Sequence, residues 1–520
     1  MMKRNYLTSV ALGALALAAG AMPAMAQNVI TLDIPQPFGG LDPAKISDQL
    51  DYTAAVNLYD ALLTVVDGGA LKGELAESWE VSDDATEVTF KIREDATFSD
   101  GSPVEASDVV YSLERLLRIN QGPANLFSDL LSQGSVTAED AKTVKFKLNK
   151  TFAPFLTTVP SLFILNEDVV RANEGSDDGQ EWLSTNAAGG GAYVPKDGPN
   201  GTGFTIVRDQ DYYGGFNESP IDEVRWVVVN DEATVRSMAA SGELSFASTF
   251  LSPDTFAALA AMERFTVEDT ETATAYLLKL NSQVAPTDDV HIRRAIALAT
   301  DYETIREIIY PGVQLNGPLP SAFGDAVASD LAPPTYDLEA AAAEIAQSKY
   351  AGQPIPITLG FLSGYKFQED INLMLQANLE ALGFVVTQQG DTWARLTELA
   401  ATPETTPAVS HVFFGPTYPS ADSMFFTQYH SASAGTWASM EWLNDPQIDA
   451  WIDEARATGD VAAQNAIYQD IQRKLVDLQS DVYMVTLTAK IAMDKCLSGY
   501  TFVPMQSVPY DFTRYTWLCD

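Results

Sequence analysis

Strands and helices alternate along the second half of this chain, and no other feature of the sequence constrains its fold as strongly. Short apolar runs rich in β-branched and aromatic residues predict strands at residues 357–362 and 409–414. Amphipathic stretches predict helices around them, at residues 291–309, 338–350, 371–382, 448–456 and 462–478. This order is typical of α/β architecture, in which helices cover a sheet. Nearer the N-terminus, alternating residues 29–34 predict a strand, and Ser107 is placed to cap a helix.

Length and charge narrow the class of protein. The chain has 520 residues, of which 46% are hydrophobic, so it can bury more than one core and has room for two to four domains. Its formal net charge of −39, from 31 basic and 70 acidic residues, repels phosphate backbones and anionic lipid. We therefore expect no nucleic-acid partner. No oligomerisation element is evident, which favours a monomer.

The first 26 residues predict the compartment. Lys3 and Arg4 precede an apolar stretch at residues 7–19, and the small residues Ala24 and Ala26, on either side of Met25, fit a cleavage site after Ala26. This pattern is typical of a secretory signal peptide. The alternative, a membrane anchor, is disfavoured because the stretch is shorter than the roughly 20 residues that span a bilayer. We expect export to the periplasm, with the peptide removed.

Only two cysteines are present, Cys496 and Cys519, and both lie in the exported part. In an oxidising compartment such a pair predicts a disulfide that closes a short loop near the C-terminus. A metal site is less favoured, because the pair lacks the CxxC spacing and no histidine lies near it.

Catalytic motifs are weak. The three histidines, His291, His411 and His430, form no zinc-binding spacing, and neither a GxSxG elbow nor a phosphate loop is present. Residues 363–366 match SxxK of penicillin-recognising enzymes, but the SDN and KTG motifs are absent. We expect no catalytic residue, no metal and no cofactor. An exported hydrolase remains a remote alternative.

One segment resembles a known family. From Gly73 the chain reads GELAESWEVSDDATEVTFKIREDATFSDGSPVEASDVVYSLERLL, which is similar to the signature of the extracytoplasmic solute-binding proteins of ABC importers, family 5, the dipeptide, oligopeptide and nickel group. Further landmarks follow in the family's order. They are LDP (41–43), LYDALL (58–63), GGGAY (189–193), DYYGG (211–215), SGE (241–243), LN (280–281), IRRAIALATD (292–301) and YPSADSMFF (418–426). The resemblance covers nearly the whole exported chain.

The resemblance implies an α/β, two-lobe periplasmic-binding-protein fold (type II, cluster C) with an inserted α+β domain. Ligand would lie in the cleft between hinged lobes, and the closed form would be recognised by an inner-membrane ABC permease. The expected division is a signal peptide (1–26), lobe I (27–69, 187–283 and 487–520), an inserted domain (70–186) and lobe II (284–486).

A departure from the family bears on the ligand. Peptide-binding members carry an aspartate after the strand that corresponds to residues 409–414, and it pairs with the ligand's α-ammonium. Here Pro416 occupies roughly that position, and Asp422 is the next acid. A buried ammonium without a partner is costly. A sugar, oligosaccharide or opine-like conjugate is therefore the first expectation, and a di- or oligopeptide is the alternative. Nickel is disfavoured, because no histidine cluster lies near the expected cleft.

The candidate ligand-binding residues come from alignment with regions that contact ligand in the family. For Trp393 and Phe413 the alternative is packing in the lobe core, for Trp437 it is core or lobe-surface packing, and for Lys366 it is a solvated side chain. They are Phe38, Gly39, Gly40, Tyr365, Lys366, Trp393, Phe413, Gly415, Pro416, Thr417, Tyr418, Asp422 and Trp437.

Overall fold

A computed structural model describes residues 28–46, 49–66, 69–249, 251–501, 503 and 510–519. The predicted signal peptide and its cleavage site lie outside these residues. Among the helices of the described residues, none is both long and apolar enough to cross a membrane.

The α-helices are α1 (Gln49–Leu58), α2 (Ala106–Ile119), α3 (Phe155–Thr158), α4 (Glu167–Ala172), α5 (Gln180–Leu183), α6 (Glu232–Ser241), α7 (Pro253–Ala260), α8 (Val290–Leu298), α9 (Tyr302–Thr304), α10 (Leu338–Gln347), α11 (Lys366–Ala381), α12 (Trp393–Leu399), α13 (Ala421–Tyr429), α14 (Pro446–Ala457) and α15 (Val461–Leu478). The strands are β1 (Val29–Ile34), β2 (Leu63–Val65), β3 (Leu71–Gly73), β4 (Ala76–Val81), β5 (Glu87–Ile92), β6 (Val136–Asp140), β7 (Thr143–Lys147), β8 (Tyr193–Asn200), β9 (Gly203–Arg208), β10 (Glu223–Val228), β11 (Phe246–Ala247), β12 (Phe265–Leu280), β13 (Gly312–Gln314), β14 (Ile355–Leu362), β15 (Phe384–Asp391), β16 (Val409–Phe414), β17 (Asp481–Asp494), β18 (Leu497–Ser498) and β19 (Thr516–Trp517).

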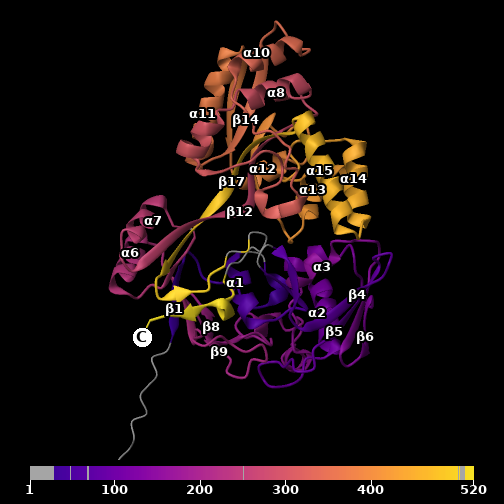
Figure 1. Ribbon diagram of the computed structural model, residues 1–520, viewed down its shortest axis with the longest axis vertical. Coiled ribbons are helices and arrows are strands. Elements are labelled where there is room, and N and C mark those ends of the chain that lie inside the picture. Colours follow the sequence, from indigo (N-terminus) through magenta and orange to yellow (C-terminus); the bar gives the residue numbers. More distant parts are fainter. Residues whose placement is uncertain are drawn as a thin grey trace, which may run out of the picture.

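One mixed sheet runs through both lobes. Its order is β15-β14-β16-β12-β17-β11-β1-β10-β9-β8, with β13 added beside β17. We keep the name lobe I for the end that holds β1 and β8–β11, and lobe II for the end that holds β14–β16. Figure 1 shows the helices α8 and α10–α15 gathered around lobe II, while α1, α6 and α7 lie at lobe I.

Strands β12 and β17 join the two lobes (Figure 1). Their lobe I halves pair from Phe265 opposite Asp494 to Glu271 opposite Thr488, and their lobe II halves from Ala275 opposite Thr486 to Lys279 opposite Asp481. A register shift separates the halves between Glu271 and Ala275. Such a bulge interrupts the ladder and bends the strand, so the link between the lobes is locally irregular.

A second, smaller sheet, β4-β5-β7-β6, lies with α2 and α3 beside lobe I (Figure 1). Apolar and polar residues alternate along β5, so Val88, Phe90 and Ile92 are buried together on one face of this sheet. They join Val109 and Leu113 of α2 in a hydrophobic core of their own. This part of the chain therefore has a sheet and a core of its own, and we call it the inserted domain.

Local signals set many element ends. The alternating VITLDI becomes β1, with Ile30, Leu32 and Ile34 in the core of lobe I. Asp445 caps α14 by accepting from the backbone N–H groups of Gln447 and Ile448, and Asp460 caps α15 in the same way. Acids at this position satisfy the free N–H groups of the first helical turn.

Two sequence expectations about helices are wrong. The helix expected at residues 291–309 ends at Leu298 and resumes at Tyr302, because the Asp301 side chain accepts from the Thr304 N–H and starts a new turn. The helix expected to be capped by Ser107 begins earlier, at Ala106. Its first turn is closed by the Asp108 carboxylate, which accepts from the Glu105 N–H at 2.9 Å.

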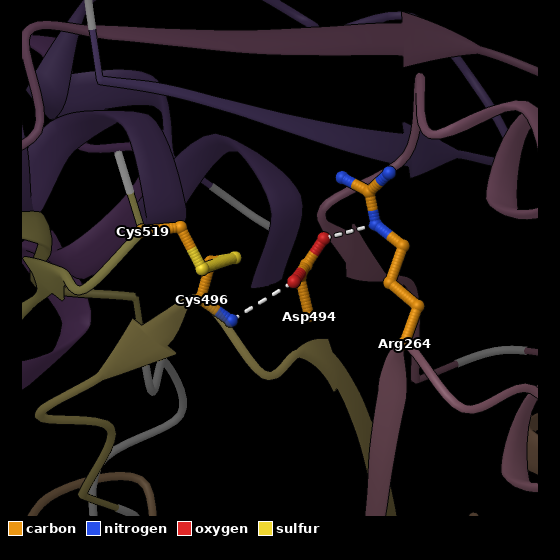
Figure 2. The surroundings of a disulfide bond; sticks show 4 residues. All are labelled: Arg264, Asp494, Cys496 and Cys519. Atoms are coloured by element: carbon orange, nitrogen blue, oxygen red, sulfur yellow. Dashed lines mark hydrogen bonds and ion pairs between the residues drawn. A yellow bond between two sulfur atoms is a disulfide. The ribbon is translucent and has the colours of Figure 1, made fainter.

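The predicted disulfide between Cys496 and Cys519 is present (Figure 2). It flanks the short β18–β19 ladder, in which Leu497 lies opposite Trp517. The buried Asp494 carboxylate accepts from the Cys496 N–H at 2.9 Å and also binds the Arg264 guanidinium. The bridge therefore ties the chain end to the final residues of β17.

Candidate functional site

The carboxyl ends of the parallel strands in both lobes lie toward the junction formed by β12 and β17. In lobe II, β16 runs antiparallel to β12 and places Phe414 opposite Ala275, beside the bulge. Strands β14 and β15 run parallel to β16, so Leu362 and Asp391 end at the same edge. Ligands of open α/β sheets bind outside such carboxyl ends.

Lobe I has the matching arrangement. Strand β11 runs antiparallel to β17, with Phe246 opposite Met493, so it leads toward the junction. Strand β1 is parallel to β11 and ends at Asp33 and Ile34 on this side. The edges after β1 and β11 in lobe I and after β14–β16 in lobe II are therefore the candidate functional site.

Aromatic rings line the lobe II edge. Trp393 begins α12 directly after β15, and its ring lies 5.4 Å from that of Trp437 in an edge-to-face arrangement. Trp437 also contacts Phe414 at 5.8 Å. Trp393 is 49% exposed, which leaves a large ring available to a ligand. The structure thus brings these two predicted tryptophans together at the strand ends.

The loop after β16 holds four further predicted residues. A Cβ at Gly415 would lie 2.8 Å from the Thr274 hydroxyl, so this glycine lets the loop approach the bulge of β12. Pro416 is half-buried and Thr417 is exposed. Tyr418 donates to the buried carboxylate of Asp422, which is on α13. The loop is therefore fixed at both ends.

Asp422 already has a cation. Its Oδ1 lies 3.5 Å from the Nε of Arg456, and the side chain has no exposed surface. Burial raises the pKa of Asp422 above the ordinary value, and Arg456 and Tyr418 only partly offset this. Its charge is therefore paired, although its Oδ1 has no hydrogen-bond donor within the described residues.

The inserted domain contacts lobe II at the same loop. The Ala153 N–H donates to the Arg456 carbonyl at 2.7 Å. The Phe152 ring lies 6.4 Å from that of Tyr418, and the Arg456 guanidinium carbon lies 4.9 Å from the centre of the Phe152 ring. This contact links the inserted domain to the loop after β16.

Other predicted residues lie apart from the tryptophan pair. Phe413 points to the opposite face of β16 and stacks on Tyr276 at 4.0 Å. Lys366, which is 70% exposed, pairs with Asp370 one helical turn along α11. Tyr365 is half-exposed and lies 5.8 Å from the Phe367 ring. The Lys366 ammonium is thus a solvated surface charge with a partner of its own.

The predicted loop after β1 is partly core. The Phe38 ring packs edge-to-face against Phe204 and Trp226, each at 5.4 Å. The Gly39 N–H donates to an Asp51 oxygen at 2.8 Å. A Cβ at Gly40, whose φ is 155°, would lie 3.5 Å from the Ser184 backbone. These residues fix the start of lobe I.

Asp33 is a residue that the sequence reasoning did not single out. It ends the alternating strand β1, is only 3% exposed, and accepts from the Ser248 N–H at 2.8 Å. Burial raises the pKa of Asp33 to about 6, and the nearby Glu232 adds to this. The only signal in the sequence was an acidic residue near the end of a strand whose other residues are Val, Ile, Thr and Leu.

The described part of the chain shows no assembled metal site. Among the described residues, no set of three or more His, Cys, Asp or Glu side chains is placed to hold a metal ion. Burial lowers the pKa of His411 to about 3, and its ring is held between Tyr276 and Asn372 inside lobe II. This histidine is a neutral part of the core.

Comparisons with known proteins give a consistent result. Residues 70–436 match the model of bacterial extracellular solute-binding proteins, family 5. The chain is 30% identical to the probable D,D-dipeptide-binding periplasmic protein DdpA of Escherichia coli K12, over 89% of this chain and 90% of that protein.

Two solved structures share the fold. One is the periplasmic binding protein DppA of Helicobacter pylori in complex with the peptide STSA, with a TM-score of 0.73 and 20% identity over 94% of this chain and 98% of that one. The other is AgaA of A. tumefaciens in complex with agropinic acid, with a TM-score of 0.72 and 24% identity over 94% and 98%. At such identities these matches establish the two-lobe architecture alone.

Proposed function

Because the chain belongs to the bacterial extracellular solute-binding proteins, family 5, we propose that it captures a short peptide between its two lobes. Members of this family bind small solutes and deliver them to an ABC permease. The chain is therefore a solute-binding protein and not an enzyme. Its relatives are periplasmic, which agrees with the predicted export. A monomeric state and the absence of a nucleic-acid partner stay predictions.

The observation that carries the peptide proposal is the likeness to the probable D,D-dipeptide-binding protein along almost the whole of both chains. The earlier preference for a sugar or an opine-like conjugate rested on Pro416 standing where peptide binders have an acid. The agropinic acid complex comes from a protein whose likeness supports only the fold. The comparisons thus favour the peptide alternative.

Closure would occur at the irregular link between β12 and β17. The bulge between Glu271 and Ala275 is where the two lobes share a broken ladder, and hinges are a few residues that absorb backbone rotation. Closing there brings the carboxyl edges of both lobes toward one another. A small ligand between them would lose most of its contact with water, so a few polar groups would fix its orientation.

The test is a thermal-shift screen of the mature protein, followed by calorimetry. The panel sets L,L- and D,D-dipeptides and tripeptides against sugars, oligosaccharides and opines. A ligand present at 100 times its Kd adds about 2.7 kcal/mol of stability, which is visible as a shift of several degrees. We expect the shift with peptides. A shift with sugars or opines and none with any peptide would refute the proposal.

Two variants place the ligand in the structure. Trp393→Ala removes a half-exposed ring at the lobe II edge, and we expect it to weaken peptide binding about tenfold, the value of one large aromatic contact. Tyr336→Ala is the matched control, because Tyr336 is 44% exposed and precedes α10, away from the strand ends. Equal affinities in the two variants would argue against a ligand at this edge.

A further inference from the structure

We propose that Asp33, at the carboxyl end of β1, is the group of this protein that binds the ammonium of its ligand. The inference rests on the proposed peptide ligand and names the chemistry that lobe I contributes. It also accounts for Pro416 in lobe II, because a carboxylate supplied by one lobe makes an acid in the other unnecessary.

The placement of Asp33 is the first reason. The register of β1 with β11 and of β11 with β17 sets Asp33 at the edge of lobe I that faces the junction with lobe II. This is the edge at which open α/β sheets bind ligands. Asp33 therefore occupies a functional position in the sheet, although its side chain is almost wholly buried.

The second reason is that the Asp33 carboxylate lacks a cation. Its Oδ1 accepts from the Ser248 N–H, and within the described residues no other residue donates to it and no Lys or Arg forms an ion pair with it. Glu232 and Tyr510, which lie near it, supply no positive charge. A buried charge without a partner is destabilising, so retaining one calls for a reason.

Other buried acids in the described residues show the contrast. Asp42 binds Arg115, and Asp494 binds Arg264. Glu441 and Asp481 share the buried ammonium of Lys279. Asp60 forms no ion pair within the described residues but receives the hydroxyls of Tyr212 and Tyr213. Asp33 has a single donor within the described residues, the Ser248 N–H on its Oδ1.

A cavity of about 30 Å³ adjoins this carboxyl edge. Its lining includes Asp33, Pro35, Thr53, Ser248, Thr249 and Tyr510. A cavity needs about 10–15 Å³ to hold one water molecule, so this one admits a group as small as an ammonium but not a sugar ring. The apolar remainder of its lining, which includes Leu32 and Trp226, lowers the local polarity and would strengthen a charge pair formed there.

The experiment compares wild type, Asp33→Asn and Asp422→Asn by calorimetry. The probes are alanyl-alanine, in whichever of the L,L and D,D forms binds, and its N-acetylated form, which lacks the ammonium. Asparagine keeps an oxygen for the Ser248 N–H and removes only the charge. Asp422→Asn tests the rival position, since it removes the acid that follows Pro416 in lobe II and is paired with Arg456.

We expect wild type to prefer the free amine, Asp33→Asn to bind it at least about tenfold more weakly, and Asp422→Asn to retain the preference. Unchanged affinity in Asp33→Asn would overturn the role of Asp33 while leaving a peptide ligand intact. Loss in Asp422→Asn alone would reassign the ammonium to lobe II. Equal binding of both probes by wild type would overturn an ammonium subsite. Binding of uncharged sugars and of no peptide would overturn both proposals.

Discussion

Removing the disulfide between Cys496 and Cys519 is expected to destabilise lobe I, because it increases the conformational entropy of the unfolded chain. The bridge joins residues 23 positions apart. For a loop of that length, the chain-entropy relation gives about 3.4 kcal/mol at 25 °C. The folded geometry should survive reduction, because the β18–β19 ladder and the Leu518 N–H to Cys496 carbonyl bond, at 2.7 Å, hold the same strands together.

The assay is differential scanning calorimetry of the exported protein before and after reduction, beside the variant C496S/C519S. For a cooperative unit of 150–250 residues, each kcal/mol corresponds to about 2–4 °C, so the transition that contains lobe I should fall by about 7–14 °C. Thiol titration supplies the independent readout. The native protein should show no free thiol, and the reduced and unfolded protein should show two.

The double variant is also the control for the reductant. Reduction should leave its melting temperature unchanged, since it has no bridge to lose. A drop of less than 2 °C in the reduced wild-type protein would refute the entropic reasoning. It would mean that the unfolded chain near residues 496–519 is already restricted without the bridge.

Three further outcomes are expected. Lys279→Met leaves two buried carboxylates without their ammonium and should lower the free energy of unfolding by about 3–5 kcal/mol in a denaturant titration. Lys366→Met, at an exposed pair, should leave the midpoint of the titration unchanged. Equal effects of the two substitutions would show that the buried cluster is not stabilising. Arg456→Lys keeps the charge but cannot stack on Phe152, so the contact between the inserted domain and lobe II should weaken by about 1 kcal/mol. Small-angle scattering of the unliganded variant should then show a larger radius of gyration. An unchanged radius would mean that this contact does not hold the two parts together. Burial raises the pKa of Asp33 from 3.8 to about 6, so its ionisation lowers the stability of the folded protein increasingly as the pH rises from about 4 through 6. Asp33→Asn should therefore be more stable than wild type by up to about 3 kcal/mol at pH 7 and equally stable near pH 3.5. A difference that does not change with pH would contradict this.

The sequence predicted local structure well where a local rule governs it. The strands at Val29–Ile34 and Val409–Phe414 have the expected bounds, because alternation and β-branched content are visible within six residues. The disulfide followed from compartment and count alone. The two-lobe fold followed from a resemblance along nearly the whole chain and is confirmed by the solved structures.

Contacts between distant residues were beyond such rules. Asp422 was considered for a ligand ammonium, yet its cation is Arg456, 34 positions on and brought beside it only by the packing of α13 against α14. Asp33 carries no local signal of its role, because a polar residue in an alternating strand is expected to face solvent. In the folded chain that face is covered, and the position becomes a buried acid.

The crossing of β12 and β17 also sets the order in which the chain can fold. The core of lobe I combines Ile30 and Leu32 with Tyr510, Phe512 and Tyr515, so it cannot close before the last residues are available. Lobe II draws its cores from residues 273–487, one stretch in the middle of the chain. Domains that emerge first during synthesis usually fold first. Lobe I contains the N-terminal strand but needs the C-terminal residues to complete its core. Lobe II, whose residues come later than that strand, is synthesised in full before lobe I is complete.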